Sequence, residues 1–209
     1  MPRFITFEGI EGSGKTTQIQ MLSNHLEDIG IEHLLTREPG GTPIGDQIRR
    51  LVLHPGNTTM TATCELLLYT AARAQHIEQV IGPNLAEGRM VLCDRFKDAT
   101  LAYQGYGRGL SIELIRHLHA REGLALNPDL TLLFDIEVDT ALDRARHRDA
   151  TRNIDETRFE QEDFAFHDRV RTGYLDLARK ESQRIVVIDA RGTTAEVHQR
   201  VLDTMRLVL

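Results

Sequence analysis

The stretch Gly9-Ile10-Glu11-Gly12-Ser13-Gly14-Lys15-Thr16 matches the pattern G-x-x-x-x-G-K-[ST] of a phosphate-binding loop, or P-loop. Its context matches too, because an apolar, strand-like run (3–7) precedes it and a helical pattern (15–29) follows it. Glycines let such a loop fold around phosphate with its N–H groups pointing inward, and the helix N-terminus adds partial positive charge. The sequence therefore predicts a nucleoside triphosphate site that runs from Gly9 to Thr17.

Three side chains of this loop have chemistry of their own. Lys15 is expected to reach the β- and γ-phosphates, which makes it a candidate catalytic residue, and the Thr16 hydroxyl is expected to coordinate Mg²⁺. Glu11 is unusual, because an acid beside bound phosphates is electrostatically unfavourable. We therefore expect Glu11 to have a specific task rather than to be a solvated loop residue.

Outside the loop, apolar runs alternate with helical patterns along the whole chain. This alternation implies right-handed crossovers and an α/β fold, a P-loop NTPase-type doubly wound parallel sheet of about five strands flanked by helices. Ligands of such sheets bind at the carboxyl ends of the strands. No linker-like stretch interrupts 1–209, so we expect a single domain. The predicted strands are 3–7, 32–36, 90–93, 130–136 and 185–188, and the predicted helices are 15–29, 43–53, 61–86, 111–122, 139–146, 160–180 and 194–207.

The composition excludes several classes of protein. With 209 residues, a formal net charge of −6 and 41% hydrophobic residues, the chain is neither disordered nor a general binder of nucleic acid. Its 22 arginines greatly outnumber its three lysines, Lys15, Lys97 and Lys180. Cys64 and Cys93 form no CxxC pair and are expected to be reduced, packed thiols. No apolar run approaches the roughly 20 residues of a membrane helix, so we expect no membrane association and a cytoplasmic location.

A P-loop alone does not identify a reaction, since switches, motors and kinases all use one. A GTPase switch needs an Asn-Lys-x-Asp stretch for guanine, which the sequence lacks. An ATPase that acts through partners needs an acidic pair after an apolar strand, and 132–135 is only the nearest match. A kinase of deoxynucleosides or of another nucleoside monophosphate is the nearest enzymatic alternative. A nucleoside kinase must deprotonate a 5′-hydroxyl and needs a carboxylate for it.

Further motifs follow the P-loop in a fixed order. They are Thr36-Arg-Glu-Pro-Gly-Gly-Thr42, Leu66-Leu-Leu-Tyr69 with Arg73, Asp94-Arg95-Phe96, Ala102-Tyr-Gln-Gly105 and Asn127-Pro-Asp-Leu-Thr131. Each is weak alone, but the ordered set resembles bacterial thymidylate kinase (dTMP kinase) from the first strand to the last helix. The resemblance implies phosphoryl transfer from ATP to dTMP, giving dTDP and ADP in dTTP biosynthesis. It also implies Mg²⁺ as the cofactor and a homodimer as the assembly.

The resemblance further implies an acceptor site. Tyr69 and Arg73 lie four residues apart, on one face of a predicted helix, and match positions that stack on thymine and bond its O4. Pro39 matches a position whose preceding peptide can be cis. Tyr103 lies where a flat ring can exclude a ribose 2′-OH, and Glu11 matches the acid that approaches the 3′-OH. The expected dTMP-binding residues are Glu11, Glu38, Arg49, Tyr69, Arg73, Arg95, Thr100, Tyr103 and Gln104.

Asp94 and Arg95 directly follow a predicted buried strand, at its carboxyl end. A carboxylate there can hold Mg²⁺ through water, so Asp94 joins Thr16 as an expected metal residue. The guanidinium of Arg95 can bind a phosphate with two hydrogen bonds, and in the family the matching Arg holds the dTMP phosphate, so Arg95 is also a candidate catalytic residue. No catalytic base is expected, because the acceptor phosphate has a second pKa of about 6 and is mostly dianionic at pH 7.

An arginine-rich segment, about 144–158, is expected to form a lid. Arg144, Arg148 and Arg152 share one face if the helix persists, although a solvated helix of mixed charge is the alternative interpretation. In the family, the Arg that stabilises the transferred charge comes from the P-loop or from the lid, and the P-loop position is Gly12 here. We therefore expect Arg148, Arg152 or Arg158 to be catalytic, and Arg144 and Arg148 to contact ATP.

Two expectations concern the rest of the chain. The nine histidines show no metal-ligand spacing, so His117 and His119 are expected at the surface and no metal is expected beyond the Mg²⁺ of the nucleotide. The long helix at 61–86 can supply a dimer face, although its apolar stripe equally suits the core.

Overall fold

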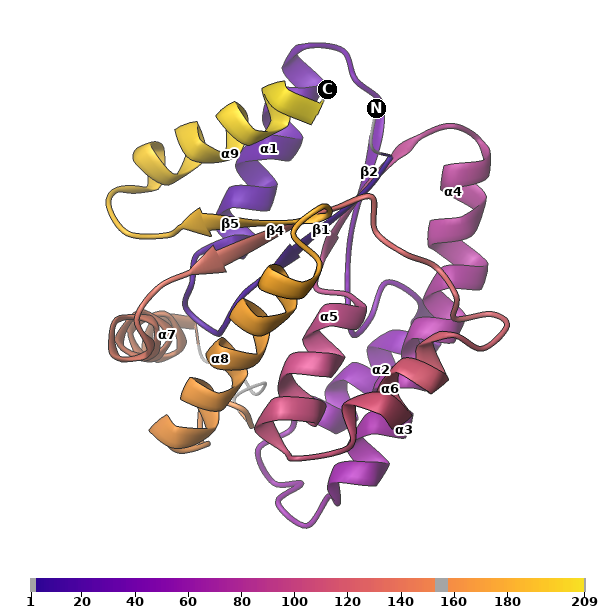
Figure 1. The fold of residues 1–209 in the computed structure, drawn as a ribbon, viewed down its shortest axis with the longest axis vertical. Helices are drawn as coiled ribbons and strands as arrows, with labels where there is room; N and C mark the ends of the chain where they lie inside the picture. Colours follow the sequence, from indigo (N-terminus) through magenta and orange to yellow (C-terminus); the bar gives the residue numbers. More distant parts are fainter. Residues whose placement is uncertain (1–2, 153–157, 209) are drawn as a thin grey trace.

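The fold is built on five short strands that all run parallel. A computed structural model of the protein describes residues 3–152 and 158–208. In the sheet the strands stand in the order β2-β3-β1-β4-β5 (Figure 1). This confirms the predicted fold class, and each strand ends within one residue of its predicted bounds. The strands are β1 (Phe4–Glu8), β2 (His33–Arg37), β3 (Met90–Asp94), β4 (Leu130–Asp135) and β5 (Ile185–Asp189).

Strand β1 is the centre of the core and of the site. All five of its residues are buried, as expected of a strand covered on both faces. It pairs with β3 on one side and β4 on the other, which puts Phe7 beside Asp94 and Glu8 beside Leu133. The carboxyl ends of these strands therefore lie together, where the chain crosses from one half of the sheet to the other.

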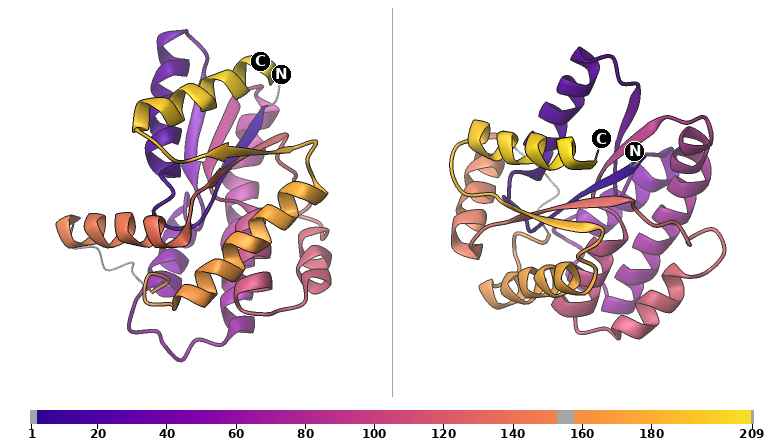
Figure 2. Two further views of the ribbon diagram at one scale, coloured as in Figure 1. Left: turned by 60° about the vertical axis from the view of Figure 1, so that its left-hand side comes forward. Right: turned by 45° about the horizontal axis from the view of Figure 1, so that its top comes forward.

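Helices cover both faces of the sheet. On one face α1 (Lys15–Asp28) lies beside α9 (Thr194–Val208), and on the other α8 (Phe164–Lys180) packs on β4 and β5 (Figures 1 and 2). Helix α8 begins later than predicted, because the Asp163 side chain accepts a hydrogen bond from the Phe166 amide at 2.7 Å and caps it there.

The side of the protein where the acceptor residues are expected, called the acceptor side below, consists of helices that follow β2 and β3. They are α2 (Pro43–Leu53), α3 (Ala62–His76), α4 (Gly82–Ala86), α5 (Lys97–Thr100) and α6 (Ile112–His119). The predicted helix 61–86 is continuous but contains a π-helical stretch, 77–81, between α3 and α4. Helix α5 also runs on into a π-helical stretch, 101–107, and forms one helical segment with it.

The segment that is expected to form a lid is only partly described. Helix α7 (Val138–Arg152) extends away from the body of the protein (Figure 2). Residues 153–157 lie outside the described part, as do the side chains of Arg148 and Arg152.

Two expectations about burial are wrong in part. Cys93 is buried as predicted, but Cys64 is exposed, because it lies in the first turn of α3 beside the buried Glu65 and Leu66 rather than on the buried face. His117 is exposed as predicted, but His119 is buried, because α6 turns it toward Arg73. No helix within 3–152 and 158–208 has the length and apolar character needed to cross a membrane.

Candidate active site

One large cleft of about 1030 Å³ opens at the carboxyl ends of the strands. It extends from the P-loop to the helices of the acceptor side. Most of the predicted site residues line it: Glu11, Gly12, Ser13, Gly14, Lys15, Thr16, Thr17, Glu38, Arg49, Tyr69, Arg73, Asp94, Arg95, Thr100, Tyr103, Gln104 and Arg144. Gly9, Ile10 and Arg158 do not line it.

The P-loop joins β1 to α1 as predicted, and its glycines are required by geometry. Gly12 has φ +74°, and a Cβ there would lie 1.9 Å from the carbonyl oxygen of Ala141 in α7. Gly14, at φ +89°, directly precedes α1, and no side chain caps that helix. The N–H groups of the first turn are therefore available to an anion.

Lys15 is buried in this loop, with 6% of its surface exposed. Burial lowers its pKa, and the neighbouring charge of Arg95 lowers it further. Its Nζ lies 3.9 Å from a carboxylate oxygen of Glu11, the acidic residue of the loop that is expected to have a specific task. A poorly hydrated cation with one distant carboxylate is a strong partner for phosphate.

Arg95 lies between the P-loop and the acceptor side. Its φ of +70° is unusual for a residue with a side chain, and it directs the guanidinium across the end of β1. The guanidinium donates to the Gly9 carbonyl at 2.9 Å, to the Tyr103 hydroxyl at 3.2 Å and to the Glu11 carboxylate. Burial opposes the charge of Arg95, but Glu11, Tyr103, Tyr174 and Glu8 together raise its pKa well above the ordinary value. Glu11 therefore holds the arginine in place.

The expected metal residues also meet. The Thr16 hydroxyl donates to Oδ2 of Asp94 at 2.7 Å. Oδ1 of Asp94 is buried and has no hydrogen-bond partner among the described residues. Two neighbouring oxygen ligands, the Thr16 hydroxyl and the Asp94 carboxylate with its unpartnered Oδ1, fit a Mg²⁺ ion that is held mainly by phosphates and water.

The end of the cleft where the base is expected is organised around Arg73, a buried residue of α3. Its Nε donates to Glu38 at 2.8 Å and its Nη1 donates to the Thr100 hydroxyl at 3.0 Å. Nη1 also lies 3.2 Å from Nε2 of His119, and burial together with the charge of Arg73 lowers the pKa of that histidine to about 2. His119 is therefore neutral and accepts from Arg73. On the other side, Nδ1 of His76 lies 3.1 Å from Glu38.

The remaining acceptor residues complete the walls. Tyr69 lines the cleft half-buried, one helical turn before Arg73, and Tyr103 packs its ring edge-on against Phe159 at 5.3 Å. Arg49 donates to the carbonyl of Pro39 at 3.1 Å, directly after the Glu38–Pro39 peptide, which is cis. A planar, half-buried ring, a held guanidinium and further cations suit a nucleotide with a base at one end and a phosphate at the other.

Comparison with known proteins decides the family. The thymidylate kinase family model matches residues 7–201. The chain belongs to the thymidylate kinase family. A curated thymidylate kinase of Syntrophotalea carbinolica is 56% identical over 202 residues, which cover 96% of this chain and 94% of that protein. One of Trichlorobacter lovleyi is 52% identical over 203 residues, covering 97% and 96%. The crystal structure of thymidylate kinase from Ehrlichia chaffeensis superposes with a TM-score of 0.77 at 35% identity and 97% coverage of both chains. These findings confirm the resemblance.

In this member of the thymidylate kinase family, two arginines of the expected lid occupy different places. Arg144 lines the cleft and donates to the carbonyl of Ala190 at 3.4 Å. Arg158 instead lies behind the acceptor wall, 7% exposed, with its Nη2 2.6 Å from the buried carboxylate of Glu65 and its Nη1 3.0 Å from the Val52 carbonyl. Of the three candidate catalytic arginines, Arg158 is the one whose side chain the structure describes. Its contacts with Glu65 and Val52 hold it away from the cleft.

Sequence reasoning missed one wall of the cleft. The turn between β5 and α9 and the first turn of α9 line the end beyond the P-loop with Ala190, Gly192, Thr193, Thr194 and Val197. No motif marks these residues. The available signal was their position after the last predicted strand, since β5 ends at the same edge as β4.

Proposed function

We propose that this chain transfers the γ-phosphoryl group of ATP to dTMP and releases dTDP and ADP, a step of dTTP synthesis. Membership of the thymidylate kinase family supports the reaction. The observation that carries the proposal is the single cleft that joins the P-loop to the pocket of Tyr69 and Arg73, with Arg95 between them. A cleft of this shape brings a donor and an acceptor phosphate together, which is most of what phosphoryl transfer needs.

In this proposal ATP occupies the P-loop end. The loop amides and the buried Lys15 bind the β- and γ-phosphates, and the base lies toward Arg144 and the turn at 190–194. Thr16 and Asp94 would hold Mg²⁺, partly through water. When bound with the nucleotide, Mg²⁺ neutralises charge on the phosphates.

The acceptor dTMP occupies the other end. Arg95 and Arg49 bind its phosphate, Arg73 donates to the thymine carbonyl, and Tyr69 stacks on the ring. Glu38, Thr100 and His119 hold Arg73 so that its donors are fixed before the substrate arrives. Glu11, Tyr103 and Gln104 line the sugar side and the wall beside it.

Transfer then depends on lid closure. An Arg that closes on the moving phosphoryl group stabilises its charge, and the closed lid excludes water that would otherwise hydrolyse ATP. We assign this role to Arg148 or Arg152 of α7, because Arg158 is engaged by Glu65. The acceptor is already a dianion near neutral pH, so no side chain has to remove a proton from it.

We also propose that the enzyme is a cytoplasmic homodimer formed by a single domain with its lid at about 144–158. Exposed leucines on the neighbouring helices α2 and α3, Leu51 at 47% and Leu67 at 53%, supply an apolar face for the contact. Light scattering of the purified protein tests the assembly, and a monomer at micromolar concentration contradicts it.

A substrate panel tests the reaction. The purified protein is assayed with ATP and Mg²⁺ against dTMP, dUMP, thymidine, CMP and AMP, with ADP formation coupled to NADH oxidation. We expect rapid turnover of dTMP and little ADP formation without an acceptor. Turnover of thymidine but not dTMP would overturn the proposal, and ATP consumption that ignores dTMP would favour an ATPase instead.

A further inference from the structure

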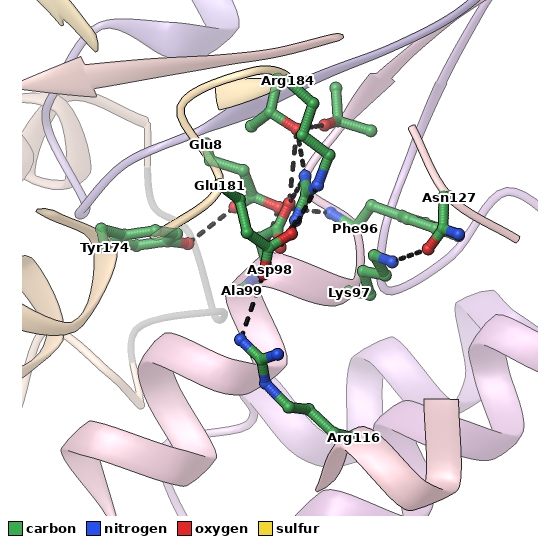
Figure 3. Close-up of polar contacts among 12 residues, drawn as sticks. Glu8, Phe96, Lys97, Asp98, Ala99, Arg116, Asn127, Tyr174, Glu181 and Arg184 are labelled. Atoms are coloured by element: carbon green, nitrogen blue, oxygen red, sulfur yellow. Dashed lines mark hydrogen bonds and ion pairs between the residues drawn. The ribbon is translucent and has the colours of Figure 1, made fainter. Parts of the chain in front are cut away.

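Glu8, the last residue of β1, is a fully buried carboxylate that does not line the cleft. Its Oε1 accepts from the backbone N–H groups of Phe96, at 2.8 Å, and Ala99, at 3.2 Å. Its Oε2 accepts from the hydroxyl of Tyr174 at 2.7 Å (Figure 3). Each oxygen of this carboxylate is therefore tied to a different segment of the chain.

The two amides belong to the start of the helical segment 97–107. Phe96 is the residue before α5, and its side chain makes no capping hydrogen bond. Glu8 supplies the missing acceptor from another element, and a carboxylate at a helix N-terminus is electrostatically favourable. It bonds the same two N–H groups that a capping box satisfies locally.

This arrangement differs from the other capped helices. Helices α2, α3, α6 and α8 are capped by the side chain of the residue directly before them: Thr42, Thr61, Ser111 and Asp163. A local cap fixes only its own helix. A cap borrowed from the end of β1 fixes the helix relative to the P-loop, which begins at the next residue.

Groups of the proposed acceptor site lie on both sides of this cap. Arg95 precedes it, and its left-handed φ of +70° is held between two backbone hydrogen bonds: its own N–H donates to Phe7 at 3.0 Å, and the next N–H donates to Glu8. Thr100 and Tyr103 follow it on the same helical segment and line the cleft.

Tyr174 links Glu8 to the side chain of Arg95. Its hydroxyl donates to Glu8 and accepts from Nη1 of Arg95 at 3.2 Å. Behind the helix, Arg184 engages Asp98 with two hydrogen bonds of 2.7 Å, which fixes the other side of the first turn (Figure 3).

We propose that Glu8 is a positioning residue for the acceptor nucleotide: it sets Arg95 and the segment 97–107 at a fixed distance from the P-loop. This inference rests on the proposed function only in that the acceptor is the molecule bound at Arg95. A displacement of about 1 Å between reacting groups can cost on the order of 100-fold in rate, so a rigid link between donor and acceptor sites has catalytic value.

The surroundings of Glu8 determine whether its carboxyl group is ionised. Burial and the charge of Asp98 raise its pKa to about 7, against the opposing effects of Arg95, Tyr174 and the Phe96 amide. The cap is strongest when the carboxylate is ionised, because hydrogen bonds to a charged acceptor are stronger than neutral ones.

The test compares Glu8→Gln and Glu8→Ala with Asp129→Asn. Asp129 is a matched control, because its Oδ2 also accepts from two backbone amides of the same strand segment, those of Arg3 and Phe4, at the opposite end and away from the cleft. For Glu8→Gln we expect kcat/KM for the acceptor to fall about tenfold while KM for ATP changes less than about twofold, and for Glu8→Ala a fall on the order of 100-fold. Asp129→Asn should leave both constants within about twofold.

Two results would overturn the proposal. One is a Glu8→Gln enzyme whose kinetic constants for the acceptor match those of Asp129→Asn. The other is a KM for ATP that rises by as large a factor as kcat/KM for the acceptor falls. Amide exchange of Phe96 and Ala99, which should speed up in both Glu8 variants, tests the cap without any substrate. If the substrate panel identifies an acceptor other than dTMP, the proposed function fails, and the split is measured with that acceptor instead. If Glu8→Ala does not fold, the isosteric Glu8→Gln decides.

Discussion

Replacing Arg158 by Ala separates a structural role from a catalytic one. The structure gives Arg158 a buried position, where its guanidinium bonds the Glu65 carboxylate at 2.6 Å and the Val52 carbonyl at 3.0 Å. Glu65 is fully buried and also accepts from Gln104 at 2.8 Å and from Arg108 at 3.3 Å. The variant therefore leaves a buried carboxylate with two of its three partners.

The cost follows from this geometry. Removing one member of a buried ion pair costs about 3–5 kcal/mol when the other charge is left uncompensated. Because Arg108 and Gln104 still serve Glu65, we expect the low end, about 3 kcal/mol, and a Tm lower by about 6–12 °C for a chain of this size. At a temperature well below that Tm, kcat should fall less than about tenfold, since Arg158 does not line the cleft.

The assay measures Tm by calorimetry and kcat with saturating ATP and dTMP for alanine variants of Arg148, Arg152 and Arg158. Replacing the arginine that stabilises the transferred charge should lower kcat on the order of 10³-fold or more, with little change in ATP affinity. An Arg158→Ala enzyme with an unchanged Tm and a thousandfold lower kcat would refute the reasoning. It would mean that Arg158 leaves Glu65 and enters the cleft when the lid closes.

Three further predictions concern the P-loop, the buried Glu8 and the metal. Gly12→Ala should raise KM for ATP at least about tenfold, because the added Cβ would lie 1.9 Å from the carbonyl oxygen of Ala141. The control Gly30→Ala, with φ +75° and no atom within 4 Å of the added Cβ, should show only the backbone cost of about 1–2 kcal/mol in urea unfolding. Equal values of KM for ATP in the two variants contradict this prediction. Between about pH 4.5 and 7 the unfolded chain ionises Glu8 while the folded chain keeps its proton, so Glu8 should make folding less stable by up to about 3 kcal/mol as pH rises through this window. The difference in unfolding free energy between the wild type and Glu8→Gln should show that slope, and a flat difference from pH 5 to 8 contradicts it. Asp94→Asn should raise the Mg²⁺ concentration needed for half-maximal activity about tenfold, with rescue at high Mg²⁺, and an unchanged Mg²⁺ titration removes Asp94 from the metal site.

Local signals predicted most of the fold. The strands end within one residue of their predicted bounds, because each is a short apolar run bounded by turn residues or charges. The P-loop was also local, since eight consecutive residues contain its glycines, its lysine and its hydroxyl. The family resemblance then assigned residues that are far apart in sequence, such as Arg73 and Arg95, and the structure brings both to one cleft.

Side-chain pairing between distant segments could not be predicted in this way. Nothing near Arg158 in the sequence shows that Glu65, 93 residues earlier, is its partner. His119 was expected at the surface together with His117, and only the position of Arg73 explains its burial. The same limit applies to Glu8, which looks like one more residue of the loop until the amides of Phe96 and Ala99 are placed against it.

The acidic residues of the cleft explain how so many arginines can be held ready there. Arg95 is held by Glu11 and Arg73 by Glu38, so each guanidinium has its direction fixed before a nucleotide binds. A side chain that is already fixed loses little conformational freedom on binding, which favours the substrate. The two carboxylates differ in what happens next. In the proposed binding mode Glu38 can remain on Arg73, because thymine is neutral, whereas the acceptor phosphate would share Arg95 with Glu11 and repel it. In the same mode an uncharged hydroxyl beside Glu11, such as the 3′-OH of dTMP, would offset that repulsion by donating to the carboxylate, and the acid in the loop would then link phosphate binding to recognition of the sugar.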